Sequence, residues 1–230
     1  MGAAVPSPAI AQLTEAEIFL ELNDTDGDLG LHVAIDGAPY TRLRIEDPKE
    51  RLILALRGDG GLLRQGLTQL FLESAEPSFD ELSPGRFFRR FPEGPYEIEV
   101  IRGRRELEAT AELSHVLAAP PSAVTVSGLP AAEDCDAVPL PRVREPVVIG
   151  WEPVTGPHPE IGRSGPVEIE RYQLFVEQGD VKFAVDLPPS RTEFEVPAEI
   201  LATRGVFKFE IIARTTERNN TAIESCFVLQ

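Results

Sequence analysis

Short segments in which apolar and polar residues alternate, separated by turns rich in Pro and Gly, constrain this chain more than any other feature. In 17–23, Ile18, Leu20 and Leu22 share one face of an extended strand, and the charged Glu21 lies on the other. Similar strand patterns occur at 29–35, 40–46, 52–56, 67–73, 95–102, 107–116, 123–126, 147–151, 169–177, 181–186, 192–196, 206–214 and 222–228. Because a period of two belongs to strands with one buried face, the sequence predicts a mostly β protein.

One segment breaks this pattern and predicts a short helix. Ser83 fits a helix N-cap, and Pro84 fits the first helical position. Phe87, Phe88 and Phe91 then fall on one helical face. We expect these three rings to fill a core rather than to form a binding face.

A Pro-rich segment at 118–122 divides the 230-residue chain almost in half, which is enough length for two small domains. We expect a flexible leader or signal-peptide remnant at 1–16 and an N-terminal antiparallel β-sandwich at 17–118, which contains the short helix. A second domain is expected at 122–230. It places about seven short strands in about 110 residues, which is typical of a Greek-key sandwich.

Three runs of the second half match a known family. The run 147–154 contains Trp151 in a W-x-P-V pattern, and 172–177 and 205–213 alternate cleanly. The second half therefore resembles a fibronectin type III domain, and this resemblance implies an immunoglobulin-like sandwich with a buried Trp in its second strand. Phe207 stands at the position of the family's corner tyrosine, where it keeps the packing but cannot form the hydroxyl hydrogen bond.

Several features favour export. Ala9-Ile10-Ala11 has the small-x-small pattern of a signal-peptidase site. Cys135 and Cys226 form no C-x-x-C pair and allow one disulfide, with two buried free thiols as the alternative. The whole layout is similar to exported bacterial proteins that contain fibronectin type III domains and have no assigned activity. That similarity implies a periplasmic or extracellular protein, and the segments that carry it are 21–32, 45–48 and 66–77.

The charge balance excludes two classes of partner. The chain has 38 acidic and 22 basic residues, for a net charge of −16. Sequence-independent binding to nucleic acid or to anionic lipid needs a basic surface, so neither is expected. No stretch approaches the roughly 18 consecutive apolar residues of a membrane span.

The first expected hairpin carries a candidate metal site made of Glu21, Asn23, Asp24, Asp26 and Asp28. Ca²⁺ prefers six to eight oxygen ligands, which carboxylates and an Asn carbonyl supply. The ordinary alternative is a solvated Asp/Gly turn. The sequence therefore predicts one structural calcium ion in the first hairpin.

Catalytic patterns are sparse. The three histidines are far apart in the sequence, and we expect His32 and His115 to be packing residues and His158 to be an exposed loop residue. There is no nucleophile elbow or phosphate-binding loop. We therefore expect a non-enzymatic binding or scaffold module with an unknown protein or glycan partner.

Two alternatives remain open. A carbohydrate-binding or weakly carbohydrate-active protein would need aromatic platforms, for which the candidates are Tyr40, Tyr96, Tyr172 and Trp151. An assembly role would pair edge strands with another chain, and Lys is nearly absent from the expected strands as a guard against such pairing. The glycosylation sequons at Asn23 and Asn219 are interpreted as chance.

Overall fold

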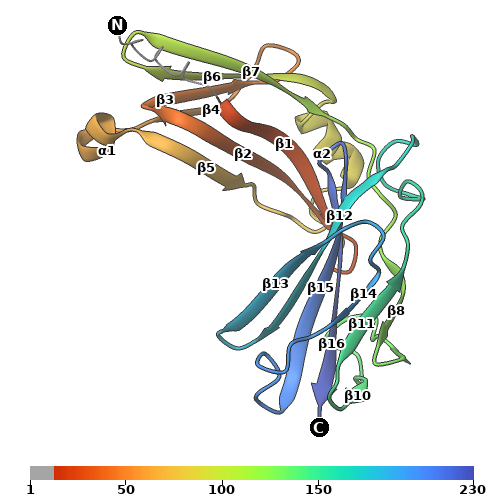
Figure 1. The fold of residues 1–230 in the computed structure, drawn as a ribbon. Coiled ribbons are helices and arrows are strands. Elements are labelled where there is room, and N and C mark those ends of the chain that lie inside the picture. The colour runs from red at the N-terminus through yellow and green to blue at the C-terminus, as the bar shows by residue number, and fades with distance from the viewer. Residues whose placement is uncertain (1–12) are drawn as a thin grey trace, which may run out of the picture. The chain divides into compact units, whose positions relative to one another are not determined.

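Strands dominate the fold, which confirms the mostly β class (Figure 1). A computed structural model describes residues 13–230, and the leader expected at 1–16, with its signal-peptidase pattern at 9–11, lies mainly outside the described residues. The first strand begins at Leu13, four residues before the expected start at Glu17.

Sixteen strands and two helices are found in the described residues. The first part of the chain contains β1 (Leu13–Asn23), β2 (Asp28–Tyr40), β3 (Arg42–Glu46), β4 (Leu52–Arg57), α1 (Gly60–Gln65), β5 (Leu67–Glu73), α2 (Pro84–Arg90), β6 (Gly94–Arg102) and β7 (Arg105–Leu113). The second part contains β8 (Ser122–Val126), β9 (Leu129–Pro130), β10 (Arg142–Val143), β11 (Val148–Glu152), β12 (Ile169–Gln178), β13 (Val181–Leu187), β14 (Glu193–Glu195), β15 (Gly205–Thr215) and β16 (Asn220–Leu229).

The described residues divide into two compact units. Unit 1 comprises the start of β1 up to Ile18, His32–Glu73 and Pro92–Leu113, and unit 2 comprises Phe19–Leu31, Ser74–Phe91 and Ser114–Gln230. The β1–β2 hairpin therefore contributes residues to both units. The division of the chain into domains at 17–118 and 122–230 stays a prediction.

Unit 1 is built from antiparallel strands in the order β4-β3-β6-β7, together with the antiparallel pair β2 and β5. Alternation along these strands places one set of apolar side chains in the core: Val33, Ile35, Tyr40, Leu43, Ile45, Tyr96, Ile98 and Val100. The turn expected at Asp36-Gly37 is wrong, because β2 continues to Tyr40. Between Asp36 and Tyr40 the register of β2 against β5 shifts, so the Asp36-Gly37 segment lies within the strand as an irregularity.

Unit 2 contains the expected fibronectin-type-III-like sandwich. One sheet has the order β14-β11-β8-β9, and the other contains β13-β12-β15-β16, to which β1 adds in parallel at Glu21–Asn23. Between them Trp151 packs edge-on against Tyr172 at 5.3 Å, and the Tyr172 hydroxyl accepts a hydrogen bond from the Val154 N–H at 2.8 Å. Phe207 stacks on Phe227 at 5.3 Å, as its packing role predicts.

The expected helix is confirmed as α2, with Ser83 at the N-cap and Pro84 at its start. Phe87 is buried, and its ring lies 5.0 Å from that of Phe91. Phe88 instead stacks at 4.3 Å on His115, whose Nε2 lies 2.7 Å from the Phe91 carbonyl oxygen. The helix is thus a core plug that also fixes His115.

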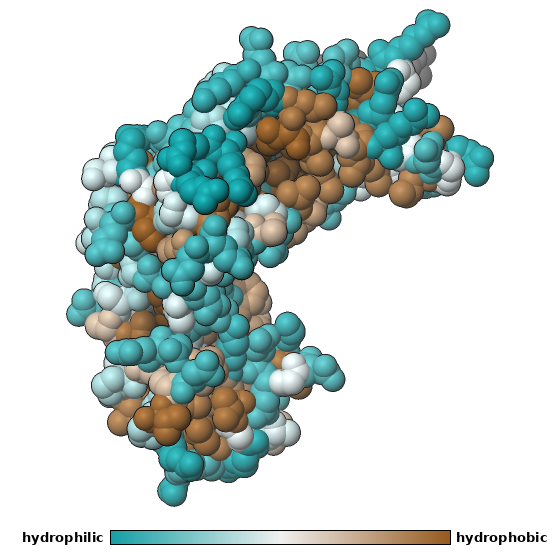
Figure 2. Space-filling view, turned by 180° about the vertical axis from the view of Figure 1, so that it is seen from behind, coloured by the Kyte–Doolittle hydropathy of each residue, from teal (hydrophilic) through white to brown (hydrophobic). Residues whose placement is uncertain are grey.

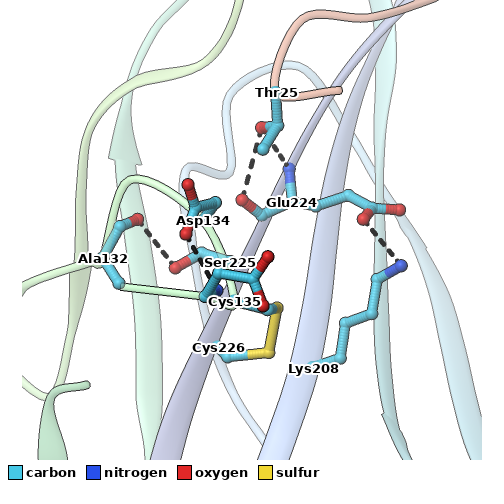
Figure 3. The surroundings of a disulfide bond; sticks show 9 residues. Thr25, Ala132, Asp134, Cys135, Lys208, Glu224, Ser225 and Cys226 are labelled. Carbon is cyan, nitrogen blue, oxygen red and sulfur yellow. Dashed lines mark hydrogen bonds and ion pairs between the residues drawn. A yellow bond between two sulfur atoms is a disulfide. The ribbon is translucent and has the colours of Figure 1, made fainter. Parts of the chain in front are cut away.

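The two cysteines form a disulfide rather than free thiols. Cys135 and Cys226 are bonded across a separation of 91 residues (Figure 3). Beside them, the Ser225 hydroxyl donates to the Ala132 carbonyl at 2.9 Å. The loop before β10 is therefore fastened to β16 by a covalent bond and by an adjacent hydrogen bond.

A buried amide joins three segments of unit 2. Asn219 is 1% exposed, and its Oδ1 accepts from the Leu20 N–H at 2.8 Å. Its Nδ2 donates to the carbonyls of Ser114 at 2.8 Å and Val116 at 3.0 Å. A glycan on Asn219 would remove these bonds, so the sequon at this position is unusable in the folded chain.

We predict that Asn219→Ala lowers the free energy of unfolding by about 2–5 kcal/mol, because three backbone groups, two of them in buried hydrogen bonds, lose their partner at once. Urea unfolding measures this difference. Gln65→Ala, which removes an exposed amide in α1, serves as the matched control. A loss no larger than that of the control would contradict the role assigned to Asn219.

Candidate metal centre

The tip of the β1–β2 hairpin is organised by Asn23. Its Oδ1 accepts the N–H groups of Thr25 at 3.1 Å and Asp26 at 3.2 Å, which forms an Asx turn. Gly27 closes the turn with φ 66°, a backbone conformation that favours glycine. The side-chain oxygen of Asn23, which was expected to ligate a cation, thus already accepts two hydrogen bonds from backbone N–H groups.

Asp24 is held by a histidine from a distant loop. His158 Nε2 lies 2.9 Å from Asp24 Oδ1. His158 Nδ1 accepts the N–H groups of Ile161 at 2.9 Å and Glu160 at 3.2 Å, so the ring proton must be on Nε2, which donates to Asp24. The expectation that His158 is an exposed loop residue is wrong, since its side chain is 6% exposed.

Asp28 is the least satisfied of the predicted ligands. Its Oδ1 is buried and has no hydrogen-bond partner among the described residues. Burial, followed by the negative charges of Glu76, Asp26, Glu224 and Glu21, raises the pKa of Asp28 to about 6. A cation beside this carboxylate would relieve both costs.

The five predicted ligands are therefore only partly brought together. Glu21, Asp26 and Asp28 are electrostatically coupled, although Glu21 Oε2 also accepts a hydrogen bond from Asn220 Nδ2 at 2.7 Å. Asn23 and Asp24 are engaged elsewhere. Within residues 13–230, no three of the predicted carboxylates place oxygens within 4.8 Å of one another. The calcium site stays a prediction.

A histidine and a carboxylate that are close enough to share an ion occur in unit 1. His32 faces Glu73 in the register of β2 and β5, and ligand atoms of the two residues lie within 4.8 Å of each other. Sequence reasoning treated His32 as a packing residue. His32 and Glu73 are about 40 residues apart in the sequence and come together only through the register of β2 and β5. No local motif reveals such a pair.

A second acidic feature of unit 2 was missed by sequence reasoning. The outer face of β12, β13, β15 and β16 holds a cavity of about 240 Å³. Its charged lining residues are Glu177, Lys182, Lys208, Glu210 and Glu224. Lys182 pairs with Glu177 at 3.0 Å, and Lys208 pairs with Glu224 at 2.6 Å (Figure 3).

Glu210 lies between these ion pairs without a lysine of its own. It is the register partner of both Phe175 on β12 and Glu224 on β16. Burial, together with the nearby charges of Glu21 and Glu224, raises the pKa of Glu210 to about 7. The Glu210 carboxyl therefore keeps its proton to higher pH than an ordinary glutamate does. Period-two alternation identifies the outward-facing residues, but not this grouping.

Solved structures resemble this chain at low sequence identity and low TM-score. No family model and no curated protein matches the chain. A two-domain fibronectin type III segment of chicken tenascin is 12% identical, with 95% of this chain and 97% of that chain covered and a TM-score of 0.32. The human OSCAR ligand-binding domain is 11% identical, with 91% and 96% covered and a TM-score of 0.28. A Ca²⁺-stabilised adhesin of an Antarctic bacterium is 11% identical, with 95% and 50% covered and a TM-score of 0.29.

The raised pKa of Glu210 predicts a pH dependence of stability. Its folded pKa of about 7 exceeds its ordinary value of 4.5, so the folded state prefers the protonated form and loses stability as pH rises from about 4.5 to about 7. Glu210→Gln is expected to raise the free energy of unfolding by about 1–3 kcal/mol at pH 8. This gain should vanish near pH 4, where the wild-type carboxyl is protonated in both states.

Urea unfolding of the wild-type protein and of the Glu210→Gln variant, measured between pH 4 and pH 8, checks this prediction. The control is Glu195→Gln, an exposed position on β14. A Glu210→Gln gain that is constant across pH would show that the effect is packing and not titration.

Proposed function

We propose that this chain is an exported, non-enzymatic binding or scaffold module with a protein partner. The observation that carries the proposal is the Cys135–Cys226 disulfide, because such bonds persist in oxidising compartments. The β-sandwich architecture offers sheet faces and edges for binding. None of the helices in the described residues is long and apolar enough to cross a membrane.

The contacts of two of the three histidines support a non-enzymatic role. His115 stacks on Phe88 and contacts the Phe91 carbonyl oxygen, and His158 uses both ring nitrogens in structural hydrogen bonds. A general base needs a ring nitrogen directed at a substrate or a nucleophile. A screen that finds turnover abolished by a single carboxylate substitution would overturn this part of the proposal.

The aromatic side chains that a carbohydrate-binding face would need are not exposed at the four expected positions. Tyr40, Tyr96, Tyr172 and Trp151 are all buried. Among the described large apolar side chains that are exposed, the one aromatic ring is that of Phe71, which is 60% exposed. A sugar-binding face would present several such rings, so a protein partner is favoured.

A structural calcium ion beside Asp28 belongs to the same proposal. It is supported by the buried, unpartnered Oδ1 of Asp28 and by the coupling of Asp28 to Asp26 and Glu21. Hard carboxylate oxygens of this kind suit Ca²⁺.

Thermal unfolding in 10 mM Ca²⁺ and in chelator, at fixed ionic strength, tests the ion. For a Kd near 10⁻⁴ M, the ion adds about 2.7 kcal/mol to the free energy of unfolding and raises Tm by several degrees. Asp28→Asn should abolish the shift, and Asp180→Asn in the β12–β13 turn should keep it. Equal Tm values for the wild-type chain in both buffers would remove the ion from the proposal.

The disulfide makes export testable. Removing it with Cys135→Ser and Cys226→Ser together is expected to lower the free energy of unfolding by about 4 kcal/mol, because the bond closes a long loop. Non-reducing peptide mass mapping of the chain, taken from fractionated host cells, should find the two cysteines linked and the chain outside the cytoplasm. Reduced cysteines in a cytoplasmic chain would contradict export.

A further inference from the structure

Two edge strands of unit 1 are almost free of charge. β4 reads Leu-Ile-Leu-Ala-Leu-Arg, and β5 reads Leu-Thr-Gln-Leu-Phe-Leu-Glu. Each lies at the end of its strand order, so within the described residues β4 pairs only with β3, and β5 only with β2. Such edges offer unpaired backbone groups to another strand.

Apolar side chains on and between these strands are left in contact with solvent. The inward-facing partners on β2 and β3 are buried, whereas Leu54, Leu56, Leu70 and Leu72 on the edge strands are only half-buried. Phe71 is exposed, as are Leu62 and Leu63 on α1, which joins the two strands. Figure 2, which is turned by 180° about the vertical axis from Figure 1, shows a group of apolar side chains. This group lies at the same height in the picture as α1, β4 and β5 in Figure 1. An exposed patch of this kind marks an interaction surface.

The charges at the strand ends indicate what covers β5. Arg64, at the end of α1, precedes β5, and Glu73 ends it. Neither residue takes part in an ion pair within residues 13–230. If a second β5 lies antiparallel to the first and is centred on Leu70, Glu73 of one copy comes opposite Leu67 of the other. Arg64 of that copy is then near this carboxylate, and two-fold symmetry forms the contact twice.

The edge strands β4, β13 and β7 are less suited than β5 to pairing with a second copy of the chain. β4 ends at Arg57 and is preceded by Arg51, which already pairs with Asp47, so antiparallel self-pairing brings no opposite charges together. β13 carries Lys182 and Asp186, but Lys182 already pairs with Glu177, and Asp186 accepts from Gln173 at 2.8 Å. β7 is rich in charged residues along its whole length.

We propose that the chain forms a two-fold symmetric dimer through antiparallel pairing of β5 with β5 of a second copy. Backbone hydrogen bonds between the two edges supply the affinity. The Arg64–Glu73 contacts at both ends set the direction and register. This inference goes beyond the proposed binding role, which does not depend on it.

Sedimentation velocity of the whole chain, at physiological salt and from about 5 to about 500 µM, measures the dimer. Glu73→Lys and Arg64→Glu, made singly, should each raise the dimer Kd at least about tenfold, because each creates two like-charge contacts. The double variant exchanges the charges and should return the Kd to within about threefold of wild type. Asp180→Lys and Arg144→Glu, which make the same changes in net charge in unit 2, should leave the Kd unchanged.

Gln69→Pro tests the edge independently of charge. The Ser74 N–H donates to the Leu31 carbonyl of β2, so by alternation the N–H groups of Gln69, Phe71 and Glu73 face the free edge. Gln69 is exposed, and the substitution removes its outward N–H without removing an N–H that faces β2. It should raise the dimer Kd at least about tenfold. Circular dichroism checks that each variant is folded. A chain that stays monomeric over the whole range, or a dimer that tolerates the charge reversals and Gln69→Pro, overturns the proposal.

Discussion

The hydrogen bonds of Asn219 are the interaction on which the rest of unit 2 depends. A single buried side chain satisfies the Leu20 N–H and two carbonyls of the 114–116 segment, and the neighbouring Thr221 hydroxyl donates to the Ala118 carbonyl at 3.0 Å. Segments from both ends and the middle of the chain therefore meet at the start of β16. Because each backbone group would be costly to bury unpaired, this arrangement permits β1 to join a fibronectin-type-III-like sheet as an additional parallel strand.

The same junction explains why acids accumulate on the outer face. Adding β1 to β16 brings Glu21 beside Asn220, and the hairpin tip then carries Asp26 and Asp28 toward Glu224. Lys208 neutralises Glu224, but Glu210 and Asp28 keep raised pKa values because burial adds to the negative field. The acidic character of this face is thus a product of strand pairing. The Asp28 and Glu210 carboxyl groups of this face therefore keep their protons to higher pH than ordinary acidic side chains do.

Period-two alternation predicted β5 and the strands of the C-terminal sandwich closely, and the Ser83–Pro84 cap with its helical Phe spacing predicted α2, because local patterns decide these elements. It failed at Asp36-Gly37, where a turn signal was overridden by a register shift within β2, and it missed α1, whose six residues bury nothing. The hairpin ligands were predicted as a set. The structure separates Asp24 because His158 arrives from a loop more than 130 residues away. Long-range partners of this kind leave no local pattern, and neither Glu210 nor the His32–Glu73 pair had one.

The net charge of −16 and the β5 edge, whose one charged residue is Glu73, act on association in opposite directions. At low ionic strength the repulsion between two such chains acts over tens of ångströms and keeps an unguarded edge apart from its copy. At physiological salt the Debye length falls to about 8 Å, so distant acids are screened while backbone pairing and the short Arg64–Glu73 contacts persist. The affinity of such a dimer therefore increases as the salt concentration rises toward physiological values. For an interface held by opposite charges alone, the affinity would decrease. The absence of lysine from β5 is then tolerable, since the acidic surface elsewhere provides the protection that edge lysines give to other sheets.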